Sequence, residues 1–290
     1  MSFTIVTDSS ANLSEEMIKK FQIQVLSLSF FIGETEYLCF SEDNVTDLAF
    51  AYQQMREKKP MRTSLVNAET ADALFHKLLS EGNDILYIGF SSGLSGTYQS
   101  VANALADASE QYPERKTASV DTLAAALGQG LLVYYAALMR EKGESFDCVY
   151  QWLMEHRTNL CHWFTVDDLF FLKRGGRISA ASAFLGTALQ IKPVLHVDDE
   201  GHLILMEKVR GRKKSLDRLV EHMQDTVSVP SEEMIVFISH GDCREDADYV
   251  AGKVEELYHP KEIFVRILDP VIGTHSGPGT VALFYYGSKR

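Results

Sequence analysis

The sequence predicts an α/β protein of two domains, and three observations carry this prediction. Short apolar runs alternate with amphipathic helical segments along the 290 residues, which is the pattern of an α/β fold. Between residues 85 and 142, strands and helices follow each other at the spacing of a parallel sheet covered on both faces. After Trp163 a hairpin signal appears among the crossovers, which indicates a mixed sheet. We therefore expect domains at 1–162 and 163–290.

The elements of the first domain follow from apolar spacing and helix caps. Ser14 is a plausible N-cap, with Glu15 and Glu16 in the first turn, where negative charge is favourable. Asn67 can cap a second helix, in which apolar side chains between 74 and 79 share one face. The expected strands are 3–6, 25–30, 85–88 and 118–120. Helices are expected at 15–21, from 68 to about 79, from about 95, at 123–142 and at 146–157.

The elements of the second domain include a hairpin. Strands 192–197 and 203–209 flank the segment 198–201, whose Asp and Gly residues favour a tight turn. Ser179 is a plausible cap for a helix of small and apolar residues that reaches 189. The remaining expected elements are helices at 213–226 and 245–257 and strands at 234–239, 263–268 and 281–286.

The composition excludes some classes of protein. The formal net charge is -12 and the pI is about 5.2, whereas a nucleic-acid-binding surface needs basic residues to neutralise phosphates. Cys39, Cys148, Cys161 and Cys243 lie far apart, which fits a reducing compartment without a disulfide framework or zinc ribbon. Because we find no signal peptide and no apolar run that could span a bilayer, we expect a cytoplasmic protein without stable membrane insertion.

The segment 85–100 is the first candidate binding site. A short apolar run ends in a turn of Ser and Gly residues, and a helix with one apolar face follows. The free N–H groups and the positive dipole end of such a helix can bind an anion. In the alternative interpretation, Ser95 or Thr97 only caps the helix.

Three further polar turns are candidates for the same ligand. Asp8 and Ser9 follow the first strand, and ligands of open α/β sheets lie beyond the carboxyl ends of strands. Thr63 offers a hydroxyl at a strand-to-helix junction, and His275 lies between two Gly-rich steps after strand 263–268. An imidazole there can bond a carboxylate and titrate near neutral pH. Ordinary turns without a ligand are the alternative for all three.

Two basic clusters stand out in this acidic chain. Lys173, Arg174 and Arg177 surround a Gly-Gly turn, and Arg suits planar carboxylate or phosphate groups. Five of the seven residues at 208–214 are basic, and Arg212 falls at the start of a predicted helix, where positive charge is unfavourable. This second cluster is a mild indication of a negatively charged partner, and a solvated surface is the alternative.

The segment from Gly89 to Gly93 matches the G-x-S-x-G pattern of the α/β-hydrolase nucleophile elbow. In that interpretation Ser91 or Ser95 would act with His275 in an esterase. Asp269 could complete the triad, whose residues follow the chain order Ser, Asp, His. The helix begins too late after Ser91 for an elbow, and no HGGG-type oxyanion segment is present. Dinucleotide, Walker A, HExxH and EF-hand motifs are absent too, so the sequence predicts no cofactor and no metal site.

Taken together, the polar segments resemble those of the DegV family, the fatty-acid-binding proteins of the FakB type. The resemblance covers nearly the whole chain. Each matching segment is weak evidence alone, but the set of segments in this order is specific to the family. The chain departs from the pattern at 124–126, where Ala replaces an expected hydroxyl or polar residue. The resemblance implies an α/β/α parallel-sheet domain, a two-layer domain with a mixed sheet, and a long-chain fatty acid in the cleft between them. The matching segments are 7–10, 62–64, 91–99, 120–122, 164–169, 172–179, 192–193, 208–214 and 273–279.

The resemblance assigns one group of residues to the fatty-acid carboxylate. Thr63 and Ser95 would hold it, His275 would bond near it, and Gly96 and Thr274 would add donors. Hydroxyls, helix N–H groups and a histidine can stabilise a carboxylate taken out of water and leave one oxygen free to react. Each buried methylene of the tail would contribute about 0.8 kcal/mol.

The resemblance further implies a partner, an ATP-dependent fatty acid kinase with a dihydroxyacetone-kinase-like ATP domain. This kinase would phosphorylate the bound carboxylate, and the acyl phosphate would feed phospholipid synthesis. Arg174, Arg210 and Arg212 would face the kinase, whereas Asp8 and Ser9 are family motif positions without an assigned role. The chain would then be a fatty-acid-binding subunit without catalytic residues of its own. A Ser/His esterase and a plain lipid carrier without a kinase are the alternative hypotheses.

Overall fold

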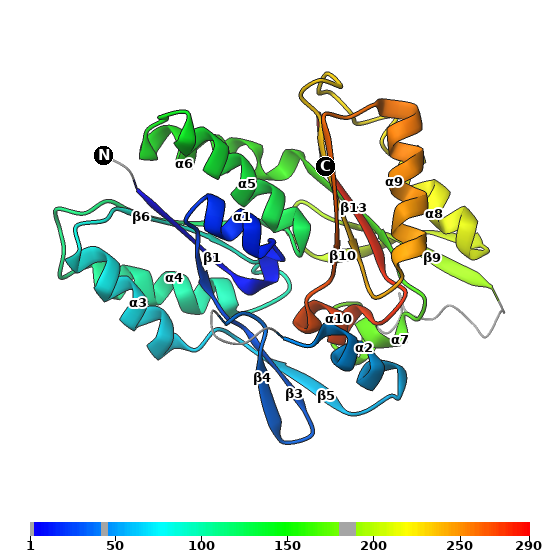
Figure 1. The fold of residues 1–290 in the computed structure, drawn as a ribbon, viewed down its shortest axis with the longest axis horizontal. Coiled ribbons are helices and arrows are strands. Elements are labelled where there is room, and N and C mark those ends of the chain that lie inside the picture. The colour runs from blue at the N-terminus through cyan, green and yellow to red at the C-terminus, as the bar shows by residue number, and fades with distance from the viewer. Residues whose placement is uncertain (1–2, 42–45, 180–189) are drawn as a thin grey trace.

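The structure is a computed structural model that describes residues 3–41, 46–179 and 190–290. It confirms the predicted α/β fold class, with one parallel and one mixed sheet as the main frameworks (Figure 1). The parallel sheet has the strand order β2-β1-β6-β7. Its strands are β1 (Thr4–Asp8), β2 (Gln24–Leu26), β6 (Ile85–Gly89) and β7 (Thr117–Asp121).

The mixed sheet has six strands in the order β10-β9-β8-β13-β11-β12. Its neighbours run antiparallel, except that β11 and β12 are parallel. Trp163, the expected start of the second domain, falls inside β8, and the division into domains at this residue stays a prediction. The strands are β8 (Leu160–Thr165), β9 (Ile191–Val197), β10 (Leu203–Arg210), β11 (Ile235–His240), β12 (Glu262–Ile267) and β13 (Val281–Tyr286).

Helices separate and cover the two large sheets (Figure 1). On one face of the parallel sheet lie α3 (Ala68–Ser80) and α4 (Thr97–Ser109). On its other face, α5 (Leu127–Glu141) packs against both large sheets and against α6 (Phe146–His156). The remaining face of the mixed sheet is covered by α8 (Arg212–Glu221) and α9 (Arg244–Tyr258). The principal core therefore surrounds α5, whose side chains contact both frameworks.

A small antiparallel sheet, which we did not expect from the sequence, lies beside these layers. Its order is β4-β3-β5, and it consists of β3 (Ser29–Ile32), β4 (Thr35–Leu38) and β5 (Met61–Ser64). It brings Thr63 on β5 next to α10, because α10 contacts both β3 and β5. The short helices are α1 (Glu15–Lys20), α2 (Leu48–Arg56), α7 (Phe170–Arg174) and α10 (Pro270–Ser276), with the 3-10 turns η1 (Ser9–Ala11) and η2 (Arg157–Asn159).

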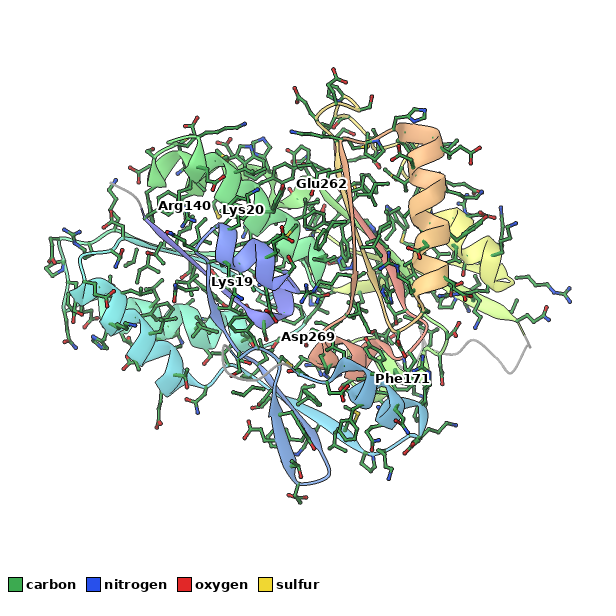
Figure 2. The ribbon with its side chains drawn as sticks, in the orientation of Figure 1. Lys19, Lys20, Arg140, Phe171, Glu262 and Asp269 are labelled. Atoms are coloured by element: carbon green, nitrogen blue, oxygen red, sulfur yellow. The ribbon has the colours of Figure 1, made fainter. Side chains whose placement is uncertain are left out.

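Several sequence predictions were wrong in detail. The run 25–30 is two strands in different sheets, because the chain bends where the Leu28 N–H donates to Ser9 Oγ at 3.0 Å. The helix expected at 123–142 begins only at residue 127, since Leu123 and Ala126 have φ of 52° and 53°, outside the helical region. The segment around His275 is a helix, not a turn, and Asp269 caps it (Figure 2).

Two predicted caps are confirmed. Ser14 Oγ accepts from the Met17 N–H at 3.1 Å, and the Asn67 side chain accepts from the N–H groups of residues 69 and 70. The helix expected at 213–226 ends earlier, at Glu221. The helix expected from Ser179 to 189 lies outside the described residues. None of the helices in the described ranges is long and apolar enough to cross a membrane.

Candidate functional site

A cavity of about 520 Å³ lies where the loops of the parallel sheet, the small sheet and the mixed sheet meet. This volume is within the range of small-molecule binding sites. Slightly more than half of the lining residues are apolar, and the polar ones include hydroxyls, histidines and arginines. The apolar lining consists of Leu28, Met61, Leu65, Phe90, Leu94, Ala125, Ala126, Phe164, Leu172, Leu203, Leu268, Val271, Ile272 and Ala282.

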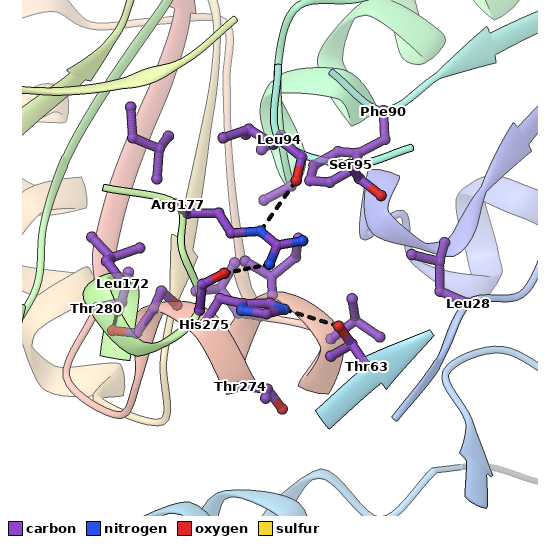
Figure 3. Close-up of a pocket in the computed structure, with 18 of the residues that line it drawn as sticks. Leu28, Thr63, Phe90, Leu94, Ser95, Leu172, Arg177, Thr274, His275 and Thr280 are labelled. Carbon is purple, nitrogen blue, oxygen red and sulfur yellow. Dashed lines mark hydrogen bonds between the residues drawn. The ribbon is translucent and has the colours of Figure 1, made fainter. Parts of the chain in front are cut away.

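The polar side of the cavity brings together three residues that the sequence singled out. Thr63 Oγ1 and His275 Nε2 are 2.9 Å apart and share a hydrogen bond (Figure 3). Ser95 lines the same cavity from the loop before α4. The three side chains come from β5, from α10 and from the β6–α4 loop, so only the folded chain brings them to one cavity. Their role as carboxylate ligands stays a prediction.

His275 is neutral at physiological pH in this environment. Burial, together with the positive charges of Arg177 and Arg174, lowers its pKa to about 4. A neutral imidazole carries one N–H donor and one acceptor. Its Nε2 bonds Thr63, and its Nδ1 lies against Gly175, where a Cβ would overlap it. A bound anion would oppose these two effects and favour the imidazolium.

Two other expected donors have different surroundings. Thr274 lines the cavity, but its hydroxyl donates to the Pro270 carbonyl at 2.7 Å. Gly96 is the exposed residue before α4 and is not among the residues that line the cavity. Ser95 Oγ accepts from the Thr97 N–H at 3.2 Å, but the N-cap residue of α4 is Gly96, without a side-chain cap. The predicted roles of Gly96 and Thr274 stay predictions.

Several polar lining residues were not proposed as ligand-binding residues from the sequence, among them Arg177, Ser276 and His162. Arg177 Nε donates to the Leu94 carbonyl at 3.1 Å, and its Nη1 donates to Gly175, which holds the guanidinium beside His275 (Figure 3). Burial lowers the pKa of Arg177. Ser276 and His162 line the cavity as well, and Ser276 Oγ and His162 Nδ1 are buried without a hydrogen-bond partner among the described residues. From the sequence, Arg177 was noted as part of a basic cluster and Ser276 lies in the matching segment 273–279, whereas His162 had no signal.

The cavity reaches the surface beside its polar side. Arg62, Ser64, Leu65 and Arg174 line it and are exposed, so we call them the mouth. Two of the four are arginines, which gives the mouth a positive charge. The Arg174 guanidinium also lies over the Phe171 ring, 5.0 Å from its centre. An anionic group at Thr63 and His275 would therefore face solvent between cations.

Asp8 and Ser9 do not line this cavity. They lie in a smaller one of about 60 Å³, where Asn12, Arg266 and Asp269 are other polar neighbours. Ser9 Oγ accepts the hydrogen bond from Leu28 that bends the chain. Any role of Asp8 and Ser9 in function stays a prediction.

The basic residues at 208–214 divide into exposed and paired side chains. Arg210 is exposed at the end of β10. Arg212 is held internally, since its Nε donates to Asp246 at 2.9 Å and its Nη2 donates to the Gly279 carbonyl at 2.6 Å. These acceptors offset the unfavourable position of Arg212 at the start of α8. Docking of a kinase by Arg174, Arg210 and Arg212 stays a prediction.

An esterase of this type needs a hydrogen bond between its serine and its histidine, and neither Ser91 nor Ser95 makes one with a histidine in the described part of the chain. Ser91 Oγ is buried and donates to the Gly201 carbonyl at 2.9 Å. Ser95 Oγ donates to Thr97 Oγ1 at 3.0 Å, while His275 bonds Thr63. Neither serine is activated by a base as a nucleophile requires. The described residues also contain no cluster of three His, Cys, Asp or Glu side chains that could hold a metal ion.

Comparisons with known proteins place this chain in a family. A family model for DegV matches residues 2–288. A DegV domain-containing protein from Clostridium perfringens is 44% identical over 288 residues, which cover 99% of this chain and 98% of that protein. The solved structure of a fatty-acid-binding DegV family protein from Thermus thermophilus is similar with a TM-score of 0.88 and 30% identity, over 99% of this chain and 100% of that chain. Bacillus subtilis DegV, solved as a fatty acid binding protein, is similar with a TM-score of 0.84 and 28% identity, over 99% and 100% of the two chains. The chain belongs to the DegV family.

Proposed function

We propose that this protein binds a long-chain fatty acid in the large cavity, with the carboxylate at Thr63, Ser95 and His275. The observation that carries the proposal is that the cavity has a polar part and an apolar part. Hydroxyls and an imidazole lie beside the exposed mouth, whereas the remaining walls are largely apolar. The fatty-acid binding of the relatives from Thermus thermophilus and Bacillus subtilis supports the same class of ligand.

The polar side of the cavity suits a carboxylate. A carboxylate leaving water needs hydrogen-bond donors and positive potential, or it becomes protonated. The hydroxyls of Thr63 and Ser95 and the His275 ring offer the hydrogen bonds, while Arg177 and Arg174 supply the potential. None of these contacts requires a direct ion pair, so one carboxylate oxygen can stay free to react.

The apolar walls favour a long acyl chain over a short one. Ten buried methylenes would contribute about 8 kcal/mol. That is comparable to the estimated cost of roughly 4–15 kcal/mol for immobilising a binding partner. A short-chain acid would bury too few methylenes to offset this cost.

We further propose that a separate ATP-dependent kinase, of the dihydroxyacetone-kinase-like type, acts on the bound acid in the cytoplasm. The free carboxylate oxygen would attack the γ-phosphorus of ATP and release ADP, giving an acyl phosphate for phospholipid synthesis. ATP and magnesium would be bound by the kinase. Arg174 at the mouth and Arg210 on β10 are exposed cations that offer contacts to an acidic partner surface.

The ligand is tested by denaturing mass spectrometry of organic extracts from the freshly purified protein. We expect a long-chain fatty acid in near-equal amount to the protein. Thr63→Val should retain at least tenfold less, because its side chain cannot bond a carboxylate or His275, whereas the exposed Thr35→Val should match the wild type. Extracts without fatty acid, together with no thermal stabilisation on adding one, would overturn the proposal.

The kinase is tested by acyl-phosphate formation in a reconstituted mixture with ATP and a purified fatty acid kinase. Arg210→Glu should slow the reaction at least tenfold and leave the Kd for the fatty acid unchanged. Lys261→Glu, another exposed cation reversed in charge, is the control. Arg212 is unsuitable for this test, because its side chain hydrogen-bonds Asp246 and the Gly279 carbonyl and its substitution would disturb the fold. Unchanged fatty-acid binding without phosphorylation of the wild-type complex would favour the plain lipid carrier.

A further inference from the structure

His162 is a polar residue in the apolar wall of the cavity. It lies on β8, is only 4% exposed and lines the cavity together with Phe164. Its ring is 4.4 Å from the Phe284 ring and 5.6 Å from the Phe164 ring, measured between ring centres. Burying an imidazole among these rings costs free energy unless its nitrogens are hydrogen-bonded. The ring therefore needs a hydrogen-bond partner.

The His162 ring lacks the hydrogen bond that buried polar groups normally have. Its Nδ1 is buried and has no partner among the described residues. The comparison with His196 on β9 is informative, because His196 Nδ1 bonds the His162 carbonyl at 3.1 Å. Burial lowers the pKa of His162 well below its usual value, so the ring is neutral and offers one donor and one acceptor.

The position of His162 is remote from the carboxylate end. Val281 pairs with Thr165 at the end of β13 that follows α10, and Phe284 pairs with His162 three residues further along. At a rise of about 3.3 Å per residue, His162 lies roughly 10 Å further along the sheet than Thr165. Thr280, which precedes β13, donates to the carbonyl of Ser276, the neighbour of His275, at 3.0 Å. The start of β13 is therefore the end of the strand that lies near His275.

We infer that this protein selects acyl chains that carry a hydroxyl or keto oxygen beyond the carboxylate end, and that His162 hydrogen-bonds this oxygen. The inference rests on the proposed function and narrows its substrate class. A hydroxyl can both donate and accept, so it fits either nitrogen of the ring, and rotation about χ2 turns either nitrogen towards the cavity. A plain acyl chain would displace water from the ring and leave its polar atoms unpaired.

The test compares the Kd values of stearate and of stearates hydroxylated at carbons 7, 10, 12 and 17, by competition with a fluorescent fatty acid. In the wild type, at least one hydroxylated acid should bind about tenfold or more tightly than stearate. His162→Phe should abolish this ratio by weakening the hydroxylated acid, without weakening stearate. His162→Gln, which keeps a donor and an acceptor, should retain part of the preference and also guards against misfolding of the Phe variant. His202→Phe changes an exposed histidine and is the control.

The outcomes separate this inference from the proposed function. If stearate binds but no hydroxylated acid is preferred, or if His162→Phe keeps the wild-type ratio, the inference is wrong and the proposed function stands. If neither kind of acid binds to the wild type, the proposed function fails and the inference fails with it.

Discussion

At the scale of single residues, Asp8 shows how a conspicuous polar motif can serve the fold. Its Oδ2 accepts from Tyr87 Oη and the Phe90 N–H, both at 3.1 Å, and from Gln129 Nε2 at 3.2 Å. Its Oδ1 accepts from the hydroxyl and the N–H of Ser10. Burial raises the pKa of this carboxyl, while the hydrogen bonds lower it. Asp8 therefore ties β1 to β6 and α5 at the end of the parallel sheet.

We expect Asp8→Asn to destabilise the protein by about 3 kcal/mol or more. The amide keeps one oxygen and puts an NH2 group in place of the other, so either the two Ser10 donors at Oδ1 or the three donors at Oδ2 lose their acceptor, at about 1–3 kcal/mol each. Urea denaturation followed by circular dichroism measures the change. Asp248→Asn, in an exposed ion pair on α9, should stay within about 0.5 kcal/mol of wild type. Equal effects of the two substitutions would contradict this role of Asp8.

His275 makes stability depend on pH. Its folded pKa of about 4 is below the ordinary value of 6.5, so the unfolded chain binds the proton more tightly between these values. The stability contributed by the neutral ring is thus complete above pH 6.5 and is lost as the pH falls towards 4, by up to about 3 kcal/mol. His275→Gln does not titrate, so wild type should lose about 2 kcal/mol more than the variant between pH 7.5 and pH 5. Parallel pH profiles in urea denaturation would refute this.

The residues of the site differ in how visible they are in the sequence. Thr63, Ser95 and His275 lie in polar segments that match the DegV pattern, and this resemblance assigned them to the carboxylate. His162 lies outside the matching segments, and Ser276 lies within one of them but received no role. Their interest lies in a buried polar atom without a partner, and neither burial nor the lack of a partner can be read from the chain.

At the scale of elements, the two large sheets are joined where the β9–β10 hairpin turn meets the β6–α4 loop. Ser91 Oγ donates to the Gly201 carbonyl at 2.9 Å, and a Cβ on Gly93 would come within 2.8 Å of the Glu200 carbonyl oxygen. Ser95, the candidate carboxylate ligand, belongs to this same loop. The hairpin turn therefore positions one side of the cavity.

Substitution of Gly201 by Ala tests this contact. Gly201 has a φ of +82°, and a Cβ there would overlap the Ser91 hydroxyl. Gly143 is a matched control with a φ of +86° and open space around it. Gly143→Ala should cost about 1 kcal/mol from backbone strain alone, and Gly201→Ala about 1–3 kcal/mol more from overpacking. Thermal denaturation compares them, and similar losses would show that the turn and the loop do not pack tightly.

Elements with strong local signals were predicted well, and those set by distant contacts were not. Strand 281–286 and the caps at Ser14 and Asn67 follow from apolar runs and cap chemistry. The small sheet escaped notice because β4 and β5 are short and largely exposed, so they lack an apolar pattern. The bend between β2 and β3 depends on Ser9, which is 19 residues from Leu28 in the chain.

At the scale of the whole molecule, the cavity is a junction between the two frameworks. Phe90, Leu94 and Ser95 reach it from the parallel sheet, whereas Phe164, Leu203 and Ala282 are contributed by the mixed sheet. Arg177 Nε donates to the Leu94 carbonyl and so crosses the junction. A ligand that fills this space must contact both frameworks and should stabilise them together.

We therefore expect a long-chain fatty acid to protect both frameworks at once. At a free concentration of 100 times Kd, it should stabilise the fold by about 2.7 kcal/mol and raise Tm by roughly 5 °C or more. Hydrogen exchange should slow both in the β6–α4 loop and in α10, because Ser95 and His275 would hold the same carboxylate. Thr63→Val should reduce both effects at equal ligand concentration. Protection confined to the mixed sheet would mean that the acid occupies one wall and does not join the frameworks.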